Sequence, residues 1–346
     1  MKILEITKPD DWHVHFREGE LLKKIVPETS KIFNRAIVMP NLSKPITNSN
    51  LSNLYKKKIL NHSKNNLNFE PLMTLYLTDD IDLNDLVNAH KKKDIFAVKL
   101  YPSGATTNSS KGIKKIKKIF PILDVLSEHG IPLLIHGEVN DKNVDVFDRE
   151  KVFIETHLNQ IYKNFPKLKI TLEHITTKFA VDYVNNTKSN LKASITPHHL
   201  IINRSHMLEH KIRPHYYCLP ILKREEDRKS LLKEAIKGNE NFFLGTDSAP
   251  HSIKAKESEC GCAGIFNTIN SIETLTQLFE NNNSLKNLEK FISFNGPKHY
   301  NLYSNKQKIR LHKSNDNLKF KSSLNVNNEN FKIFKPPFEV FWKQEN

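Results

Sequence analysis

Two histidines near the start of the chain are spaced to hold one metal ion. His13 and His15 lie within the segment from Asp11 to Arg17, and the hydrophobic residues around them are typical of a short β-strand. Side chains at positions i and i+2 of a strand point to the same face, so both imidazoles can reach one ion. A His-x-His pair also arises by chance, and a metal site therefore requires further ligands elsewhere in the chain.

Further side chains that can bind metal lie in or at the end of other hydrophobic runs. Lys99 lies within one run, and His136, His174 and Asp247 each follow another. If the runs are the parallel strands of a barrel, these side chains gather at its C-terminal mouth, where active sites of such folds lie. Core packing does not explain so many polar residues at the same end of five strands. The sequence therefore predicts one shared metal site with the ligands His13, His15, Lys99, His136, His174 and Asp247.

The predicted ligand set favours zinc, because neutral imidazoles and carboxylates are common zinc ligands. Lys99 is the exception, since a protonated amine repels a cation. It fits if its amine has reacted with carbon dioxide, which gives a carboxylate able to bridge two ions; the alternative is a buried lysine that acts as a base. Two bridged ions would share a hydroxide and polarise a carbonyl, and Asp247 would bind one ion and pass a proton to the leaving nitrogen. This chemistry is hydrolysis at an amide or ester carbon.

The elements that position these residues form an alternating pattern. Eight short hydrophobic runs are separated by longer polar stretches, which include helix candidates from Ile113 to His129, from Asp148 to Asn164 and from Glu225 to Lys237. The pattern predicts an α/β fold, a (β/α)8 TIM barrel. An open, doubly wound sheet is the alternative, but no Gly-rich phosphate-binding turn follows the first run. The predicted strands are Trp12 to Phe16, Ala36 to Pro40, Leu72 to Leu77, Ala97 to Tyr101, Pro132 to His136, Ile170 to His174, Ala193 to Thr196 and Phe242 to Asp247.

We expect one domain over residues 1–346, with the barrel over residues 9–300. Few residues precede the first strand, so an N-terminal β-sandwich is not expected. Residues 301–346 are rich in Asn, Lys and Ser, and we interpret them as an irregular C-terminal tail packed on the outside of the barrel.

The chain is strongly basic, with 53 Lys and Arg against 38 Asp and Glu and a formal net charge of +15. The lysines are scattered, and their densest clusters lie in helix-like segments, where a solvated outer face explains them. We therefore expect no nucleic-acid partner. No apolar run approaches the ~20 residues of a membrane span, and no secretory signal is recognised, so we expect a cytoplasmic protein with no membrane contact. The three cysteines, Cys218, Cys260 and Cys262, are then expected to be reduced.

The motifs around these residues resemble those of the amidohydrolase superfamily, and more narrowly the dihydroorotases of the short bacterial type. The resemblance extends in order from about residue 9 to Tyr300. It implies the reversible cyclisation of N-carbamoyl-L-aspartate to L-dihydroorotate with loss of water, a step of de novo pyrimidine (UMP) biosynthesis, carried out by a homodimer. The matching segments are Pro9 to Arg17, Val38 to Asn41, Lys99 to Pro102, Thr106 to Ser110, His136 to Val139, Glu173 to Thr177, Tyr217 to Lys223 and Gly245 to His251.

The resemblance also implies a role for each site residue. His13 and His15 would hold the more buried zinc ion with Asp247, His136 and His174 the second, and carboxylated Lys99 would bridge the two together with a hydroxide. Asp247 would be the general acid and base. The residues expected to bind the substrate are Arg17, Asn41, His251, the main chain of Leu219 and the backbone around Ala263; Thr106 and Thr107 would belong to a mobile loop from Gly104 to Ser110.

Several of these residues have a simpler interpretation. Asn41 could be a turn residue, and Arg17 could pair with Glu18 or Glu20 at the surface. We expect His198 and His199 to be structural and Glu138 to support the metal ligands indirectly. Two other functions also remain open: another cyclic amidase of the superfamily, disfavoured by the carboxylate-binding set, and a non-enzymatic homologue, disfavoured by the complete ligand set.

Overall fold

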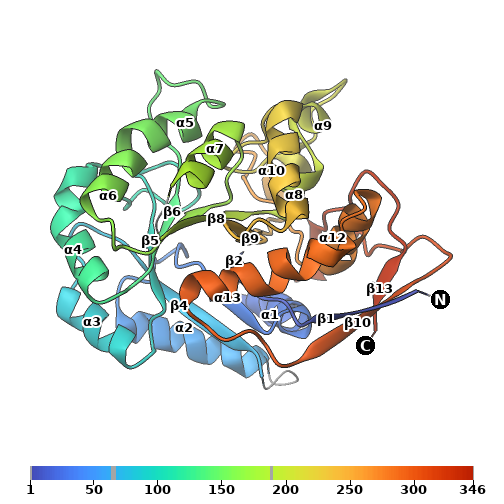
Figure 1. Cartoon of the computed structure of the whole chain (residues 1–346), viewed down its shortest axis with the longest axis horizontal. Coiled ribbons are helices and arrows are strands. Elements are labelled where there is room, and N and C mark those ends of the chain that lie inside the picture. The colour runs from blue at the N-terminus through green and yellow to red at the C-terminus, as the bar shows by residue number, and fades with distance from the viewer. Residues whose placement is uncertain (1, 64–67, 188–189, 346) are drawn as a thin grey trace.

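Eight parallel strands form one sheet that closes into a barrel (Figure 1). The computed structural model describes residues 2–63, 68–187 and 190–345, and the strands follow one another around the barrel in chain order. The barrel strands are β2 (Asp11–Val14), β3 (Arg35–Val38), β4 (Glu70–Tyr76), β5 (Ala97–Leu100), β6 (Leu133–His136), β7 (Ile170–Glu173), β8 (Leu191–Ile195) and β9 (Phe242–Leu244). A parallel bridge between Val14 and Ser248 joins the two edges, and the backbone N–H of Asp247 donates to the carbonyl of His13 over 2.9 Å. The predicted (β/α)8 barrel is confirmed.

The inside of the barrel has an apolar floor with polar side chains above it. The floor is one buried cluster that contains Trp12, Ile37, Leu72, Ala97, Leu134 and Phe243. A side chain two positions further along a strand shares the same face. Lys99 therefore follows Ala97, and His136 follows Leu134, toward the C-terminal ends of β5 and β6. The candidate ligands thus lie on a packed hydrocarbon base that excludes water from below.

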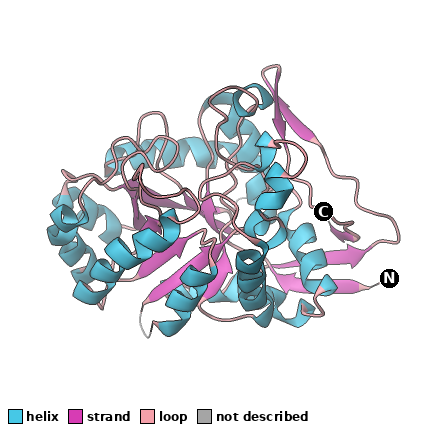
Figure 2. Cartoon of the chain, turned by 90° about the horizontal axis from the view of Figure 1, so that it is seen from above, coloured by secondary structure: helices cyan, strands magenta, loops and turns pink. Residues whose placement is uncertain are grey.

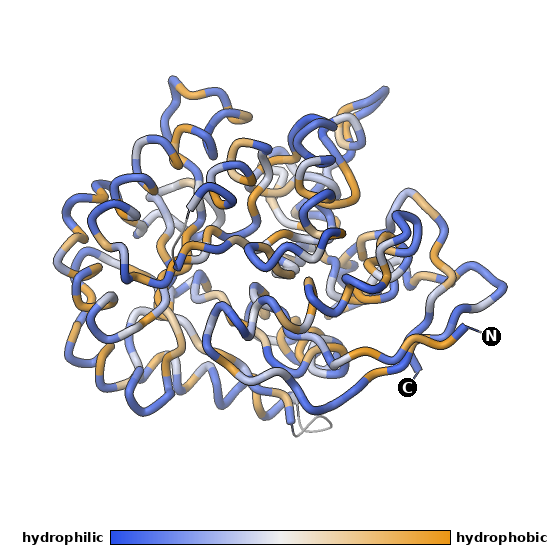
Figure 3. Tube along the Cα trace, in the orientation of Figure 1, coloured by the Kyte–Doolittle hydropathy of each residue, from blue (hydrophilic) through white to orange (hydrophobic). Residues whose placement is uncertain are grey.

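Helices surround the barrel, and the strands lie inside them (Figure 2). Figure 3 shows that hydrophobic segments follow the strands, whereas hydrophilic and hydrophobic residues alternate along the outer helices. Among the described residues, none of the helices combines the length and the apolar character needed to cross a bilayer. The α-helices are α1 (Gly19–Ile32), α2 (Ser49–His62), α3 (Leu83–Lys91), α4 (Phe120–Glu128), α5 (Arg149–Phe153), α6 (Asn159–Asn164), α7 (Lys178–Asn186), α8 (Pro197–Ile201), α9 (Arg204–Leu208), α10 (Glu225–Lys237), α11 (Ile253–Lys256), α12 (Ser271–Asn281) and α13 (Asn295–Tyr300). Shorter helical turns are η1 (Ile116–Ile119), η2 (Ile154–Leu158), η3 (Pro214–Tyr216), η4 (Leu285–Asn287) and η5 (Lys290–Phe294), of which η2 and η5 are π-helical.

The predicted helices are found with some changes at their ends. The helix from Glu225 to Lys237 coincides with α10, which begins with three acidic residues and ends at Gly238 in the left-handed conformation, φ 66°. The helix predicted from Asp148 to Asn164 is the continuous series α5, η2 and α6, with a wider π turn in its middle. The helix predicted from Ile113 begins only at Ile116, as a 3-10 turn that leads into α4.

The C-terminal tail, interpreted above as irregular, instead contains four strands. The strands β10 (Lys308–Lys313) and β13 (Trp342–Gln344) form a three-stranded antiparallel sheet with β1 (Ile3–Thr7), beside both chain ends in Figure 1. The other two, β11 (Ser323–Val326) and β12 (Glu329–Lys332), form a hairpin. The polar composition concealed this sheet because its partner strand lies some three hundred positions earlier, and because only a few side chains, such as Leu311 and Trp342, are fully buried.

The floor of the barrel leaves no space for a side chain at Gly296 on helix α13. A Cβ atom placed on Gly296 would lie only 1.9 Å from Nε1 of Trp12. Trp12 is fully buried and stacks on Tyr300 with ring centroids 4.8 Å apart. Because Trp12 directly precedes His13 in β2, this packing also fixes the backbone position of the first candidate ligand.

We predict that Gly296→Ala destabilises the protein by about 1–3 kcal/mol, because overpacking forces Trp12 or α13 to shift. The thermal unfolding midpoint, measured by circular dichroism, should fall by several degrees. Lys298→Ala on the same helix is the control, since the Lys298 side chain is 71% exposed. Equal midpoints for the two variants would show that the floor tolerates the added methyl group.

Candidate metal centre

The first group of candidate ligands lies where β2 meets the end of β9. Nε2 of His13 and Nε2 of His15 are 3.2 Å apart, and Oδ1 of Asp247 lies 3.2 Å from the first and 3.1 Å from the second. All three side chains are nine-tenths buried or more. These spacings are close to the edge of about 3.3 Å of a tetrahedron with zinc–ligand bonds near 2 Å. The three side chains are thus spaced as ligands of one metal ion would be.

Asp11 holds this group in place from below. Its Oδ1 accepts from the backbone N–H of His13 and of Thr246, over 3.1 and 2.8 Å, and its Oδ2 accepts from the Thr246 hydroxyl over 2.6 Å. Burial raises the pKa of Asp11 to about 7 in spite of these bonds. The carboxyl group therefore joins β2 to the end of β9 directly beneath His13 and Asp247.

The second group lies at the ends of β5, β6 and β7. The imidazole rings of His136 and His174 have centroids 4.9 Å apart, and the His174 ring lies 5.0 Å from that of His13. Nδ1 of His174 is buried and has no hydrogen-bond partner among the described residues. Lys99 is fully buried, with Nζ 4.8 Å from the centre of the Tyr101 ring and in contact with the carboxylate of Glu173, the residue before His174. All six predicted metal ligands therefore line one end of the barrel.

Glu173 is a further site residue, for which the sequence motif alone indicated no role. It is the last residue of β7 and fully buried, and its carboxylate contacts both Nδ1 of His13, at 3.0 Å, and Nζ of Lys99. A charged residue at an inward strand position beside His174 was the signal in the sequence. Although burial raises its pKa, His13 and Lys99 together hold the pKa of Glu173 below its usual value.

The electrostatics of the first group suit a cation. Burial alone would lower the pKa of His13, but the carboxylates of Glu173 and Asp247 raise it to about 9. Burial likewise raises the pKa of Asp247, yet His13 and the hydrogen bond from His15 bring it well below 3.8. The two carboxylates thus favour a positive charge at His13, and a metal ion bound there would displace the proton. The donor set and the unpartnered nitrogen of His174 fit a centre for zinc ions.

Three site residues have a backbone conformation that L-residues rarely adopt. The φ angles are 61° for Arg17, 42° for His174 and 46° for Asp247. Each such residue costs on the order of 1 kcal/mol and is characteristic of functional sites. Hydrogen bonds hold two of them, since the N–H of His174 donates to Oγ of Ser194 and that of Asp247 to the His13 carbonyl, both over 2.9 Å.

Four of the five residues predicted to bind the substrate line one small cavity of about 20 Å³ beside the first group. His251 does not line this cavity, but its Nε2 lies 3.0 Å from Nη2 of Arg17. Burial and the nearby Arg17 lower the pKa of His251 to about 3, so the ring is neutral and accepts from the guanidinium. The cavity is lined by His15, Arg17, Asn41, Thr106, Thr107, Leu219, Asp247, Ala249, Ala263 and Gly264.

The predicted mobile loop lies over this cavity. The side-chain amide of Asn41 donates to the carbonyl of Thr107 over 3.0 Å, and that of Asn108 donates to the carbonyl of Asn41 over 3.1 Å. Thr106 and Thr107 both line the cavity. Asn41 is therefore the contact between the barrel mouth and the loop, and the cavity is small because the loop fills the space above it.

Three of the residues with a simpler interpretation have defined contacts in the structure. Arg17 donates to the carbonyl of Pro250 and contacts Nε2 of the His251 ring, and neither Glu18 nor Glu20 is its partner. His199 is bonded on both ring nitrogens, to Oγ1 of Thr196 over 2.8 Å and to the carbonyl of Pro220 over 3.0 Å. Oε2 of Glu138 lies 2.9 Å from Nε2 of His136, next to the predicted ligands.

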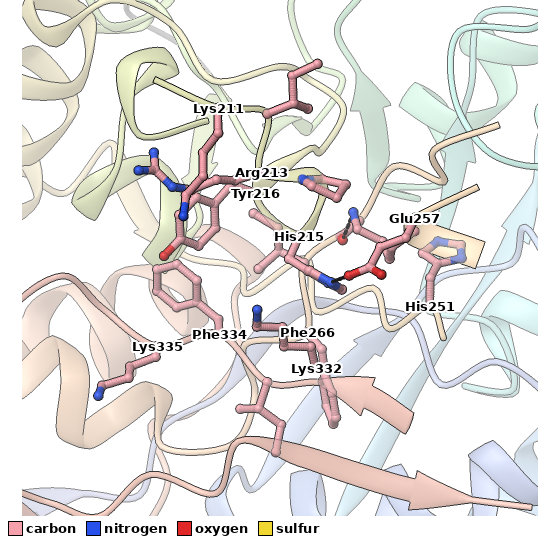
Figure 4. A pocket seen from close by; sticks show the side chains of 16 residues that line it. Lys211, Arg213, His215, Tyr216, His251, Glu257, Phe266, Lys332, Phe334 and Lys335 are labelled. Atoms are coloured by element: carbon pink, nitrogen blue, oxygen red, sulfur yellow. Dashed lines mark hydrogen bonds and ion pairs between the residues drawn. The ribbon is translucent and has the colours of Figure 1, made fainter. Parts of the chain in front are cut away.

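Figure 4 shows a larger pocket, of about 410 Å³. It adjoins the small cavity, since Gly264 lines both. Glu257 is the one acidic residue among its described lining residues, and Oε1 of Glu257 lies 2.8 Å from Nε2 of His215. The cationic lining side chains are Lys211, Arg213, Lys256, Lys332 and Lys335. The field in this pocket therefore favours an anion that approaches the site from this side.

The chain is similar in sequence and in structure to known proteins. Residues 10–341 match the model of the amidohydrolase family. A dihydroorotase of Nitrosococcus oceani is 50% identical over 311 residues, which are 90% of each chain. The crystal structure of a dihydroorotase from Campylobacter jejuni superimposes with a TM-score of 0.90 at 35% identity and covers 99% of this chain and 98% of its own. A dihydroorotase from Saccharomyces cerevisiae in complex with 5-fluoroorotic acid also gives a TM-score of 0.90, at 29% identity, over 100% and 99% of the two chains.

We predict that removal of metal lowers the stability of this protein. Ions that bind only the folded state stabilise it by about 2.7 kcal/mol at a hundredfold excess over their dissociation constant. Dialysis against a chelator should therefore lower the thermal unfolding midpoint, and added zinc should restore it. The control is the double variant His13→Asn, His174→Asn, whose midpoint should not respond. An equal midpoint for the untreated and chelated wild-type protein would contradict a metal centre.

Proposed function

This chain belongs to the amidohydrolase family and, within it, to the dihydroorotases, and we propose that its barrel mouth is a two-zinc centre that interconverts N-carbamoyl-L-aspartate and L-dihydroorotate. Ring closure forms an amide bond with loss of water, and the reverse direction hydrolyses that bond. The reaction would serve de novo pyrimidine biosynthesis. One observation carries the proposal: the candidate acid–base residue Asp247 lines the same cavity as Arg17 and Asn41, two of the residues expected to bind the substrate carboxylate.

The chain's own residues divide the work of holding the ions. His13, His15 and Asp247 would hold one zinc ion, and His136 and His174 the other. Lys99 would join the two as a carboxylated lysine, since it is fully buried and contacts Glu173, which lies against His13 and precedes His174. When bound, the two ions would activate a water molecule and polarise the amide carbonyl of the substrate.

Asp247 is proposed as the general acid and base. Its carboxylate lies between His13 and His15 on one side and the substrate cavity on the other. In hydrolysis it would take a proton from the attacking water and deliver it to the ring nitrogen that leaves. In cyclisation the proton would travel the reverse path: Asp247 would take it from the attacking nitrogen and deliver it to the oxygen that leaves as water.

The substrate carboxylate is proposed to lie against Arg17, Asn41 and His251. The guanidinium of Arg17 offers two parallel N–H donors, the geometry that a carboxylate requires. Neutral His251 keeps Arg17 in place without adding a second charge. Leu219 and Ala263 would contribute through their main chains, and Thr106 and Thr107 would close over the bound ligand.

The proposal includes a homodimer in the cytoplasm, as the resemblance to the short bacterial dihydroorotases implies. Light scattering of the purified protein tests the first part, since a homodimer has twice the mass of the 40.1 kDa chain.

We predict that Asp247→Asn lowers the rate of L-dihydroorotate hydrolysis by roughly two to four orders of magnitude, the usual contribution of a general acid or base. The loss of ultraviolet absorbance of the substrate gives the rate. Zinc content and the thermal midpoint are measured beside it, so that loss of metal is recognised separately. Turnover near the wild-type rate would remove Asp247 from its proposed role.

We predict that Arg17→Lys mainly weakens substrate binding, because an ammonium group cannot supply two parallel donors. A charge-assisted hydrogen bond contributes about 1.5–3 kcal/mol, so KM should rise roughly 10–100-fold while kcat changes much less. Lys23→Arg on the exposed face of α1 is the matched control and should leave both constants unchanged. An unaltered KM for Arg17→Lys would refute the assignment.

A further inference from the structure

We propose that Glu173 is a positioning residue that couples His13 to Lys99 and sets the plane of the carboxylated lysine. The inference rests on the two-metal centre proposed above. Glu173 does not line the substrate cavity, so it would act through His13 and Lys99 and not on the substrate itself.

The two carboxylate oxygens of Glu173 are divided between two candidate ligands. Oε1 lies 3.0 Å from Nδ1 of His13 as an ion pair, and neither atom has another polar partner among the described residues. Oε2 contacts Nζ of Lys99. The exposed fractions of the His13, Lys99 and Glu173 side chains are 2%, 0% and 0%. An unpaired charge at this depth would be very costly, so each of the three depends on the others.

The contact with His13 determines which ring nitrogen faces the metal. A neutral imidazole carries one N–H and one lone pair, and a carboxylate beside Nδ1 favours the proton there. The lone pair of Nε2 then points toward His15 and Asp247, whose ligand atoms are 3.2 Å away. Carboxylates that orient metal-binding histidines in this way typically change metal affinity 10–100-fold when they are mutated.

The contact with Lys99 persists through the modification of that residue. The ammonium group loses two protons to solvent as Nζ forms a bond to the carbon of carbon dioxide, which leaves one N–H and a carboxylate. That remaining N–H can still donate to Oε2 of Glu173. Because the new group is planar, holding its N–H against Glu173 turns its two oxygens away from that carboxylate. Glu173 would thus prepare Lys99 to bridge two ions.

Position in the barrel gives Glu173 access to both partners. Glu173 ends β7 and pairs in register with His136 on β6, and Lys99 lies near the end of β5. Glu173 also belongs to a cluster with His13 and His174 whose ligand atoms lie within 4.8 Å of one another. Both of its oxygens face nitrogen donors, however, which favours a positioning role over direct coordination.

The test compares Glu173→Gln with wild type and with Glu273→Gln. Glutamine keeps the shape of the side chain, but its NH2 group faces one of the two donors, so only one contact survives. Glu273 is a buried carboxylate on α12, outside the barrel mouth, and controls for the general cost of altering such a residue. Circular dichroism shows that each variant is folded.

Two measurements do not depend on activity. Zinc affinity is measured against a chelator of known strength, and carboxylation of lysine by the ¹³C NMR signal that appears after equilibration with ¹³C-bicarbonate. We expect Glu173→Gln to bind zinc 10–100-fold more weakly than wild type and to show a smaller carbamate signal, with Glu273→Gln unchanged.

The outcomes separate this inference from the function it rests on. Wild-type zinc affinity and carbamate signal in folded Glu173→Gln would overturn the positioning role and leave the metal centre standing. Equal losses in Glu173→Gln and Glu273→Gln would reduce the effect to general destabilisation and also overturn it. A wild-type protein with neither zinc nor carbamate would overturn the proposed function itself.

Discussion

The closure of the barrel between β2 and the end of β9 is the constraint on which the rest of the structure depends. Every candidate ligand lies at the C-terminal end of a parallel strand, and only a closed sheet brings the first and the last of these strands together. Asp11 makes this closure specific, because its two oxygens bind the backbone of His13 and both the backbone and the hydroxyl of Thr246. The same bonds that close the fold therefore place His13 beside Asp247.

Burial explains why so many charged groups are needed at one point. Water is excluded by the apolar floor below and by the loop above, so each charge must be balanced locally. Glu173 and Asp247 face His13, and Lys99 faces Glu173. The strained backbones of His174 and Asp247 persist because hydrogen bonds to neighbouring strands hold them. The site thus draws on stability that the core of the barrel supplies.

The barrel and the contacts among the predicted ligands followed from local patterns in the sequence. Short hydrophobic runs are typical of parallel strands that are buried on both faces. Helix α10 has a start signal at Glu225 and a stop signal at Gly238. The sheet formed by β1, β10 and β13 could not be predicted in this way, since its pairing joins the two ends of the chain and depends on few buried residues. Glu173 was overlooked for a related reason: its neighbours in sequence do not reveal that His13 and Lys99 converge on it.

The choice of substrate depends on residues other than the metal ligands. In the proposed centre, two zinc ions would polarise any amide carbonyl that reaches them, so the centre alone would not distinguish one cyclic amide from another. In the proposed role, Arg17 would add a requirement for an anionic group. Its neighbour His251 is neutral and offers a lone pair instead of a competing carboxylate. The basic pocket beyond Gly264 extends the same field outward. Under the proposed function, one continuous set of side chains would attract a substrate with a carboxylate, orient it and bring it to Asp247.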